Sequence, residues 1–152
     1  MLRDLKYGLN KPVLATYKAA KAMKTGVAVV IDDSKGTFDY PKAATGANLY
    51  FVDKERVATG YKAGVKNLSD YDDEYVTVKK DELVKLKKYI AGDEFATDAA
   101  GTPTAGKTVD FGSDGSIADS AKGSIYLYVG EYNDEGHTLK KIRVLDTVQA
   151  NS

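Results

Sequence analysis

The stretch "SIYLYVGEY", residues 124–132, has the clearest strand pattern in the chain. Successive side chains of an extended chain point to opposite sides, so Ile125, Leu127 and Val129 share one face and the two intervening tyrosines share the other. Isoleucine, valine and tyrosine also favour strands over helices. The stretch therefore predicts a β-strand.

Other short runs of β-branched and aromatic residues have the same character, and turn signals rich in glycine and aspartate separate them. The runs are "GVAVVID" (26–32), "ANLYFVD" (47–53), "EYVTV" (74–78) and "TLKKIRVLD" (138–146). In the last of these, Ile142 and Val144 alternate with Arg143, as in a strand with one wet face. The pattern as a whole predicts a mainly β chain.

The length of 152 residues suits one domain, which can bury a core without disulfides or metal. We therefore expect a single small β-barrel or β-sandwich domain. Its predicted parts are an N-terminal extended arm or short helix at residues 1–24, a β-rich domain at 25–148, and a frayed C-terminal tail at 149–152.

Two stretches leave their secondary structure open. "KPVLATYKAAKAMKTG" (11–26) fits a helix capped by Gly26, but it also fits an extended arm that leads into a strand. "DELVKLKKYIAGD" (81–93) fits a helix whose inward face carries leucine and isoleucine. It fits equally well a strand with Val84 and Leu86 inward that turns at "AGD".

The charge and the cysteine content exclude several classes of function. The 22 basic residues balance the 22 acidic ones, so no overall basic field attracts nucleic acid or an anionic membrane. The absence of cysteine excludes thiolate nucleophiles and cysteine-based metal sites. No apolar run approaches the roughly 20 residues of a membrane span, and the N-terminus lacks the apolar core of a signal peptide. We expect neither nucleic acid nor a membrane as a partner.

Tyrosine is abundant, with 11 residues, while tryptophan is absent. A tyrosine ring packs well across strands, and its hydroxyl also suits an interface. Packing is the favoured interpretation.

The segment "GTPTAGKT", residues 101–108, matches the G-x-x-x-x-G-K-T pattern of phosphate-binding loops. Such a loop lies between a buried strand and a helix, whose first N–H groups bind the phosphates. Here a polar stretch precedes Gly101, and the alternating "TVDF" with nearby glycines follows. The context predicts an exposed, flexible connection over residues 96–108 and a strand that starts near Thr108. A helix beginning at Lys107 would contradict this prediction.

Two acidic groups contain the carboxylates that metal sites and catalytic sites use. The first comprises Asp70, Asp72, Asp73 and Glu74, which lack the spacing of a calcium loop and fit a solvated polar loop better. The second is Asp32 with its neighbour in "DDSKG". This is ordinary hairpin-turn chemistry in which Asp side chains bond the backbone and the glycine takes a positive φ.

His137 is the only histidine, so a metal site or catalytic pair built on several histidines and cysteines is excluded. No G-x-S-x-G motif accompanies it, and its place after "NDEG" fits a structural or surface histidine at a strand start. The basic residues are local groups, typical of solvated strand faces. They are Lys79–Lys80, Lys85–Lys87–Lys88 and Lys140–Lys141–Arg143. No catalytic, cofactor-binding or metal-ligating residue is assigned, and no cofactor is expected.

Three stretches together carry a resemblance to a known family. They are "MKTGVAVVIDDSKGTFDYPKAATGANLYFVDKE", "VKLKKYIAGDEFATD" and "IYLYVGEYNDEGHTLKKIRVL". Their K-x-G step into an apolar strand, the "AGD" turn into another strand and the closing pair of strands resemble the capsid decoration, or head-stabilisation, proteins of tailed bacteriophages. The resemblance spans most of residues 22–146 and consists of short motifs.

The resemblance implies a non-enzymatic β-barrel or β-sandwich module that binds the major capsid protein on the outer capsid surface and cements the lattice. It implies a homo-oligomer, with a trimer among its forms, and termini that extend as arms. The protein would be made in the host cytoplasm and reside on the virion. The alternatives are a tail-tube, adaptor or fibre-base component, a nucleotide-binding protein using residues 101–108, and a surface- or carbohydrate-binding β module.

Overall fold

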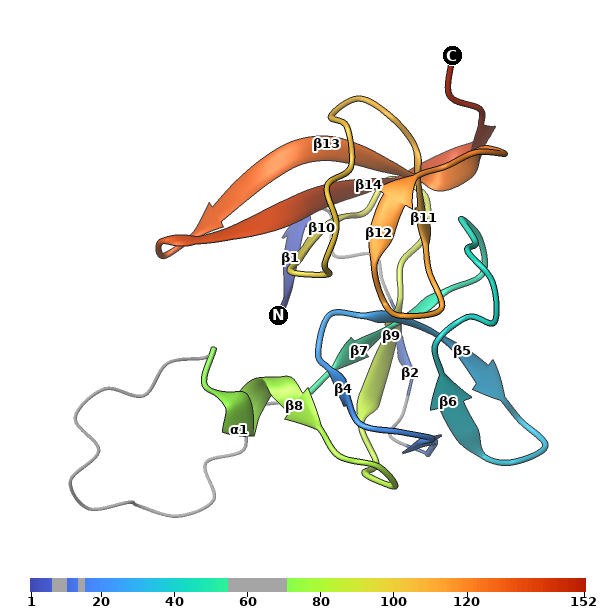
Figure 1. Ribbon diagram of the computed structural model, residues 1–152, viewed down its shortest axis with the longest axis vertical. Coiled ribbons are helices and arrows are strands. Elements are labelled where there is room, and N and C mark those ends of the chain that lie inside the picture. The colour runs from blue at the N-terminus through green and yellow to red at the C-terminus, as the bar shows by residue number, and fades with distance from the viewer. Residues whose placement is uncertain (7–10, 14–15, 55–70) are drawn as a thin grey trace.

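The computed structural model describes residues 1–6, 11–13, 16–54 and 71–152, and Figure 1 shows their arrangement. The chain is 51% strand, with α1 (Asp73–Val76) as the helix of the described residues. The prediction of a mainly β chain is confirmed. The described strands form no closed barrel, and the arrangement is compatible with a sandwich.

A four-stranded antiparallel sheet forms the upper part of Figure 1, in the order β1-β10-β14-β13. Its strands are β1 (Leu2–Lys6), β10 (Glu94–Thr97), β14 (His137–Gln149) and β13 (Ser124–Asp134). A separate hairpin of β11 (Val109–Phe111) and β12 (Ile117–Asp119) packs beside it. All of these strands except β1 come from the last third of the chain or just before it.

A six-stranded sheet forms the lower part, in the order β2-β9-β7-β5-β6-β3. Its strands are β2 (Lys11–Val13), β9 (Lys85–Lys88), β7 (Tyr50–Asp53), β5 (Ala28–Asp32), β6 (Thr37–Asp39) and β3 (Lys18–Ala19). The two-stranded sheet of β4 (Met23–Lys24) and β8 (Thr77–Val78) accompanies it.

The six-stranded sheet curls so that its edge strand β3 returns to the segment before β9. The Ala19 amide donates to the Glu82 carbonyl at 3.0 Å, and Lys18 forms a bridge with Leu83. Because β3 also pairs in parallel with β6, backbone bonds run along both of its sides. The curl encloses one of the two large cores of the protein.

Along β7 and the first residues of β5, both faces of the six-stranded sheet are buried, which explains the continuous apolar runs in these two strands. On β7, Phe51 packs into one core and the next residue, Val52, packs into the other. On β5, Ala28 and Val29 divide in the same way.

An aromatic core lies between the two large sheets. The Phe51 ring lies 4.6 Å from the Phe95 ring and 5.3 Å from the Phe111 ring, while Tyr89 and Phe95 stack at 4.1 Å. Such close ring pairs add to the free energy of simple burial. The buried members of the aromatic core are Leu2, Ala28, Leu49, Phe51, Tyr89, Phe95, Ala99, Val109, Phe111, Ile117, Tyr126, Tyr128, Ile142 and Val144.

An aliphatic core fills the curl of the six-stranded sheet, under β4 and β8. Its buried members are Ala19, Met23, Val27, Val29, Phe38, Val52, Val78, Val84 and Leu86. A third, smaller cluster brings Val76 of α1 against Ala96, Leu139 and Met1. Because Ala96 alternates with Phe95 along β10, this cluster lies on the far face of the four-stranded sheet.

The alternation predicted for residues 124–132 is confirmed, and the tyrosine face is the one that enters the core. Tyr126 and Tyr128 are buried, while Ile125, Leu127 and Val129 are half-buried. Burial raises the pKa of Tyr126 to about 12. Every tyrosine that the structure describes is buried or half-buried, in agreement with packing as the main use of this residue.

The strand alternative for residues 81–93 is confirmed, and the helix alternative is wrong. Lys85–Lys88 forms β9, with Val84 and Leu86 buried. Leu83 is 53% exposed, as the strand alternation requires. The turn at "AGD" is present, since the Asp93 amide donates to the Ile90 carbonyl at 3.0 Å.

The N-terminal segment differs from the predicted arm or helix. The described part of residues 11–26 contains three short strands, because its backbone groups pair with β9, β6 and β8. Leu2–Lys6 lies within the four-stranded sheet against β10 instead of leaving the domain. Pairing with distant strands outweighs the helical spacing of the alanines.

Two smaller predictions also require correction. Residues 74–78 were expected to form a strand, but the first three belong to α1, where the Tyr75 and Val76 amides donate to the Asp72 carbonyl. The tail at 149–152 was expected to fray, but Gln149 ends β14 and Asn151 makes hydrogen bonds with the loop before β11.

Candidate functional site

The phosphate-loop motif at residues 101–108 lies in a loop that precedes a strand. The Gly106 amide donates to the Tyr128 carbonyl at 2.8 Å, and the Lys107 amide donates to the Thr104 carbonyl at 3.1 Å. The Thr108 amide donates to Asn151 Oδ1 at 2.7 Å. Three successive N–H groups that would have to face a phosphate are therefore bonded within the protein, and no helix begins at Lys107.

The predicted boundaries of this loop are correct at one end. The strand β11 begins at Val109, next to the expected Thr108, and residues 100–102 and 104–106 are exposed. Ala96 and Thr97 are fully buried residues of β10, so the exposed connection starts later than predicted. The flexibility of the loop remains a prediction.

The two glycines of the motif have different structural roles. Gly101 has φ +119°, and a Cβ atom there would lie 2.0 Å from the Ile117 carbonyl oxygen. The loop approaches β12 closely because the Ile117 amide donates to the Ala100 carbonyl at 2.7 Å. Gly106 has φ +83° with open space around it. Backbone packing thus explains the first glycine, and turn geometry explains the second.

The turn predicted at "DDSKG" is confirmed. Asp32 Oδ1 accepts hydrogen bonds from Ser34 Oγ at 2.6 Å and from the Lys35 amide at 3.3 Å, and Gly36 has φ +62°. The hydrogen bonds from Ser34 and Lys35 lower the pKa of Asp32 to about 2. The neighbouring Asp33 accepts the Tyr17 hydroxyl at 2.6 Å. The Asp32 carboxylate thus stabilises the turn, and the Asp33 carboxylate attaches the turn to Tyr17.

The acidic group at residues 70–74 provides no described metal site. Asp70 lies outside the described residues, and Asp72 precedes α1, where its carbonyl accepts two amides. Asp73 begins the helix with an exposed side chain. Across the described part of the chain, no group of three or more His, Asp or Glu side chains is placed to hold a metal ion.

His137 is an exposed residue at the start of β14, as predicted. Its ring stacks on Tyr71, with ring centroids 3.6 Å apart and planes at 13°. The Tyr71 hydroxyl donates to Asp134 Oδ2 at 2.8 Å, and Arg3 Nε donates to the same oxygen at 2.9 Å. The turn region before α1 is thereby attached to the end of the β13–β14 hairpin and to β1.

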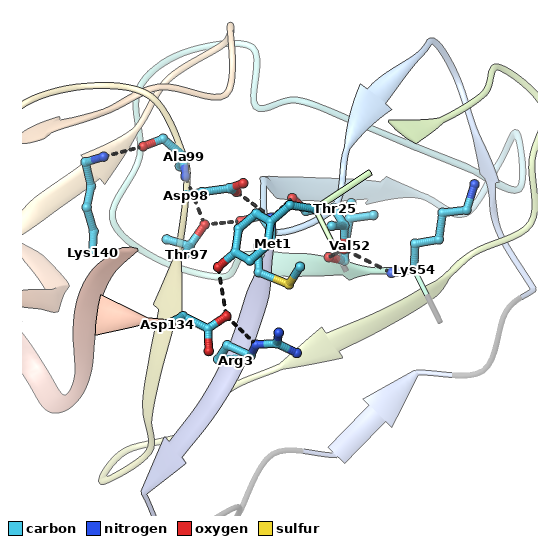
Figure 2. A network of polar contacts seen from close by, with 12 residues as sticks. Met1, Arg3, Thr25, Val52, Lys54, Thr97, Asp98, Ala99, Asp134 and Lys140 are labelled. Carbon is cyan, nitrogen blue, oxygen red and sulfur yellow. Dashed lines mark hydrogen bonds and ion pairs between the residues drawn. The ribbon is translucent and has the colours of Figure 1, made fainter. Parts of the chain in front are cut away.

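A polar network surrounds the amino group of Met1 at the junction of the two large sheets (Figure 2). The ammonium group donates to the Thr25 carbonyl at 2.9 Å and pairs with Asp98. Burial lowers the pKa of this amino group, and the nearby Asp98 carboxylate opposes the shift only in part. The residue is 6% exposed, so its contacts act in a largely dry environment.

The same network joins the sheets through two threonine side chains. Thr97 Oγ1 of β10 donates to the Gly26 carbonyl at 2.7 Å, and Thr25 Oγ1 donates to the Val52 carbonyl of β7 at 2.9 Å. On the other side of the network, Lys140 Nζ donates to the Ala99 carbonyl at 2.8 Å (Figure 2). The network therefore fixes the four-stranded sheet against the six-stranded one.

A second polar link lies at the outer side of the aromatic core. Asp4 of β1 accepts hydrogen bonds from Tyr89 and from Lys87 Nζ, both at 2.6 Å. Lys87 and Lys85 also pair with Asp53 of β7, at 3.3 and 3.2 Å. Burial raises the pKa of Asp4, but the hydrogen bonds from Lys87 and Tyr89 outweigh this effect, so its pKa lies below the ordinary value.

Most of the basic groups described as solvated faces make specific contacts. Besides Lys85, Lys87 and Lys140, Arg143 Nε donates to Glu94 Oε1 at 2.7 Å across β14 and β10. The exposed Lys79 and Lys80 fit the solvated interpretation. Sequence inspection missed the partners of the other groups because they lie dozens of residues away.

Comparisons of the chain with protein-family models, with curated proteins and with solved structures gave no significant match. Among the helices that the structure describes, none has the length and apolar character needed to cross a membrane.

The polar clusters described above link strands to one another, and their polar groups bond to other groups of the same chain. The remaining candidates for function are surfaces. One is the β13–β14 hairpin, whose strands have 11 and 13 residues. The others surround the large apolar side chains that are exposed among the described residues, which are Leu83, Ile90 and Val148. The long alternating run at 124–132 was the sequence signal for the hairpin.

Proposed function

We propose that the protein is a non-enzymatic structural component of a tailed-bacteriophage virion, which binds the outer capsid surface and cements the lattice of the major capsid protein. The observation that carries this proposal is the β13–β14 hairpin. β10 pairs with only four residues of β14, so the hairpin extends past it toward the turn at residues 134–137 (Figure 1). A long hairpin on a β scaffold offers contact area on a large protein surface.

Three further observations support the proposal. The sequence motifs resemble those of capsid decoration proteins. The polar networks of Met1 and Asp4 fix the two sheets against each other, which gives the stiff body that a cementing protein needs. Exposed apolar side chains at Leu83, Ile90 and Val148 are available for contact, whereas the described tyrosines are used in packing.

The test adds the purified protein to undecorated capsids of the virus that encodes it. We expect saturable binding and a higher temperature of capsid disruption. A variant with Glu131→Ala and Thr138→Ala removes two exposed side chains of the hairpin and should bind more weakly. The matched control, Lys122→Ala, changes an exposed side chain in the loop before β13 and should bind as well as the wild type. Absence of binding and of any gain in heat resistance would contradict the proposal.

A tail-tube, adaptor or fibre-base protein is the second candidate, because a long hairpin also suits assembly into a ring. Labelled particles separate the two functions, since label at the tail or neck contradicts decoration. The nucleotide-binding alternative is opposed by the bonded amides of Gly106, Lys107 and Thr108. A nucleotide titration of the wild type and of Lys107→Ala tests it, and we expect no magnesium-dependent binding by either.

A further inference from the structure

Two buried polar atoms have no hydrogen-bond partner among the residues that the structure describes. They are Oδ1 of Asp110 on β11 and Oγ of Ser120, the residue that follows β12. Buried polar atoms are normally bonded, so each such atom requires an explanation. The carboxylate oxygen is the more costly of the two to withdraw from water without a donor. The chain thus leaves two of its own polar groups unsatisfied in one region.

The two atoms belong to one face of the β11–β12 hairpin. The register pairs Asp110 with Ala118, so these two side chains lie on the same side. Ser120 comes two residues after Ala118, and its amide continues the pairing by donating to the Thr108 carbonyl at 2.8 Å. Side chains two residues apart share a face, which makes Ser120 a diagonal neighbour of Asp110. Ser120 is 5% exposed, so its hydroxyl lies within the protein.

A further oxygen atom lies beside the Asp110 carboxylate. A Cβ atom on Gly46 would lie 2.1 Å from Ser124 Oγ and 2.5 Å from Asp110 Oδ1, so these two oxygens are near neighbours. Ser124 Oγ donates its hydrogen to the Gly46 carbonyl at 3.1 Å and accepts the Tyr126 amide at 3.0 Å. Its single hydrogen is therefore engaged, and a lone pair remains for one more bond.

We propose that this face of the hairpin binds a calcium ion, with Asp110 Oδ1 and the hydroxyl oxygens of Ser120 and Ser124 among its ligands. The donors are all oxygens, which suit a hard cation, and calcium accepts an irregular set of oxygens where magnesium demands an octahedron. A water molecule would bond the same atoms, but only a cation offsets the charge of the carboxylate. With one carboxylate the site is weak, with a dissociation constant of about 1 mM. The site goes beyond capsid binding, and its tests use the isolated protein.

The first test measures thermal unfolding of the chelator-treated protein at constant ionic strength, with no added calcium and with about 10 mM CaCl2, roughly tenfold above the expected dissociation constant. Because the ion binds the folded protein, we expect the melting temperature of the wild type to rise by about 3–6 °C. The same concentration of MgCl2 should have a much smaller effect. A wild type that calcium does not stabilise, or that magnesium stabilises equally, would overturn the proposal, since a bound water needs neither ion.

Asp110→Asn removes the charged ligand, so calcium should no longer raise the melting temperature. Without calcium this variant should be at least as stable as the wild type, because it loses an unpartnered charge. The matched control is Asp146→Asn, which makes the same change at an exposed carboxylate of β14 and should respond to calcium like the wild type. An Asp110→Asn variant that still responds, or a control that does not, would contradict the assignment of the site.

The second test separates binding from folding at Ser120. Ser120→Ala removes a hydroxyl that has no partner among the described residues, so the melting temperature without calcium should match that of the wild type. Binding is followed by the emission of terbium, a calcium substitute excited here through tyrosine rings, and by its displacement with calcium. We expect the variant to bind calcium several-fold more weakly than the wild type. Equal affinity of the two proteins, or terbium emission that calcium does not displace, would overturn the proposed set of ligands.

Discussion

Phe51 and Val52 are neighbours on β7, yet they enter different cores. These cores differ in composition and in how far apart their residues lie in the sequence. The aliphatic core around Val52 draws on residues 19–86, whereas the aromatic core around Phe51 draws on residues 2–144. Valines and a leucine make up most of the aliphatic core, which holds Phe38 as its one buried ring, whereas several large rings meet in the aromatic core between the two sheets. The aliphatic core is therefore a local structure, and the aromatic core is what unites the chain.

The largest difference between the cores should emerge from truncating each of these neighbours. Phe51→Ala removes a ring that contacts four other rings, and we expect a loss of about 3–5 kcal/mol in the free energy of unfolding. Val52→Ala should cost about 2 kcal/mol, because it removes less buried surface. Urea unfolding measures both, and equal losses would contradict the central role of the aromatic core.

A smaller effect is expected where a loop rests on the aromatic core. Gly101→Ala forces a Cβ against the carbonyl oxygen of Ile117, a member of that core, and should cost more than about 2 kcal/mol. Gly106→Ala meets no neighbour and should cost about 1 kcal/mol, from its positive φ alone. Thermal unfolding checks the difference. Similar costs would show that the close approach to β12 contributes little.

At the edge of the aromatic core, Tyr89→Phe retains the ring and removes the hydrogen bond to Asp4. We expect a loss of about 1 kcal/mol at neutral pH. The folded-state pKa of Asp4 is lowered, so its contribution is present above the unfolded value of 3.8 and is lost as the pH falls through the folded value. The variant should lose less stability on acidification than the wild type does. An unchanged acid dependence would argue against this pair.

The smallest effect concerns the Met1 amino group between the sheets. Burial lowers its pKa from 8.0 in the folded protein. At a pH between the folded-state pKa and 8.0, the unfolded chain therefore binds more protons than the folded protein does. Stability should therefore rise with pH between the folded-state pKa and 8.0. Asp98→Asn removes the carboxylate that opposes the shift, and this should steepen the rise. Melting temperatures measured across this range test it, and a flat profile in both proteins would contradict the burial effect.

The sequence predicted the strands whose side chains alternate or form continuous apolar runs. The alternation placed Tyr126 and Tyr128 on one face of their strand and the aliphatic residues on the other. It could not show which face points inward, because both faces are apolar. The segment at 81–93 stayed open, since leucines and lysines there satisfy a period of two and a period of about 3.6. The pairing of Leu86 with Val52 of β7 decides between the two, because it places this segment in a strand.

The contacts that fix the ends of the chain were beyond local inspection. Asn151 donates to the carbonyls of Thr108 and Ser120, both at 2.9 Å, although its neighbours in the sequence are typical of a frayed end. Met1 meets Thr25 and Asp98 only after the two sheets have packed. Such contacts depend on topology, and no spacing within one segment encodes them. The sequence context did suffice to reject the phosphate loop at Lys107.

The two-faced character of β7 changes what holds its alignment with β5 and β9. In a strand with one wet face, a slip by one residue is opposed because it exposes apolar side chains to water. A slip of β7 would leave Phe51 and Val52 buried but exchange their cores, so a ring would have to occupy the space of an isopropyl group. The alignment of this strand is therefore selected by volume, and exchanging the two residues by Phe51→Val with Val52→Phe would disrupt it without altering the hydrophobicity of the chain.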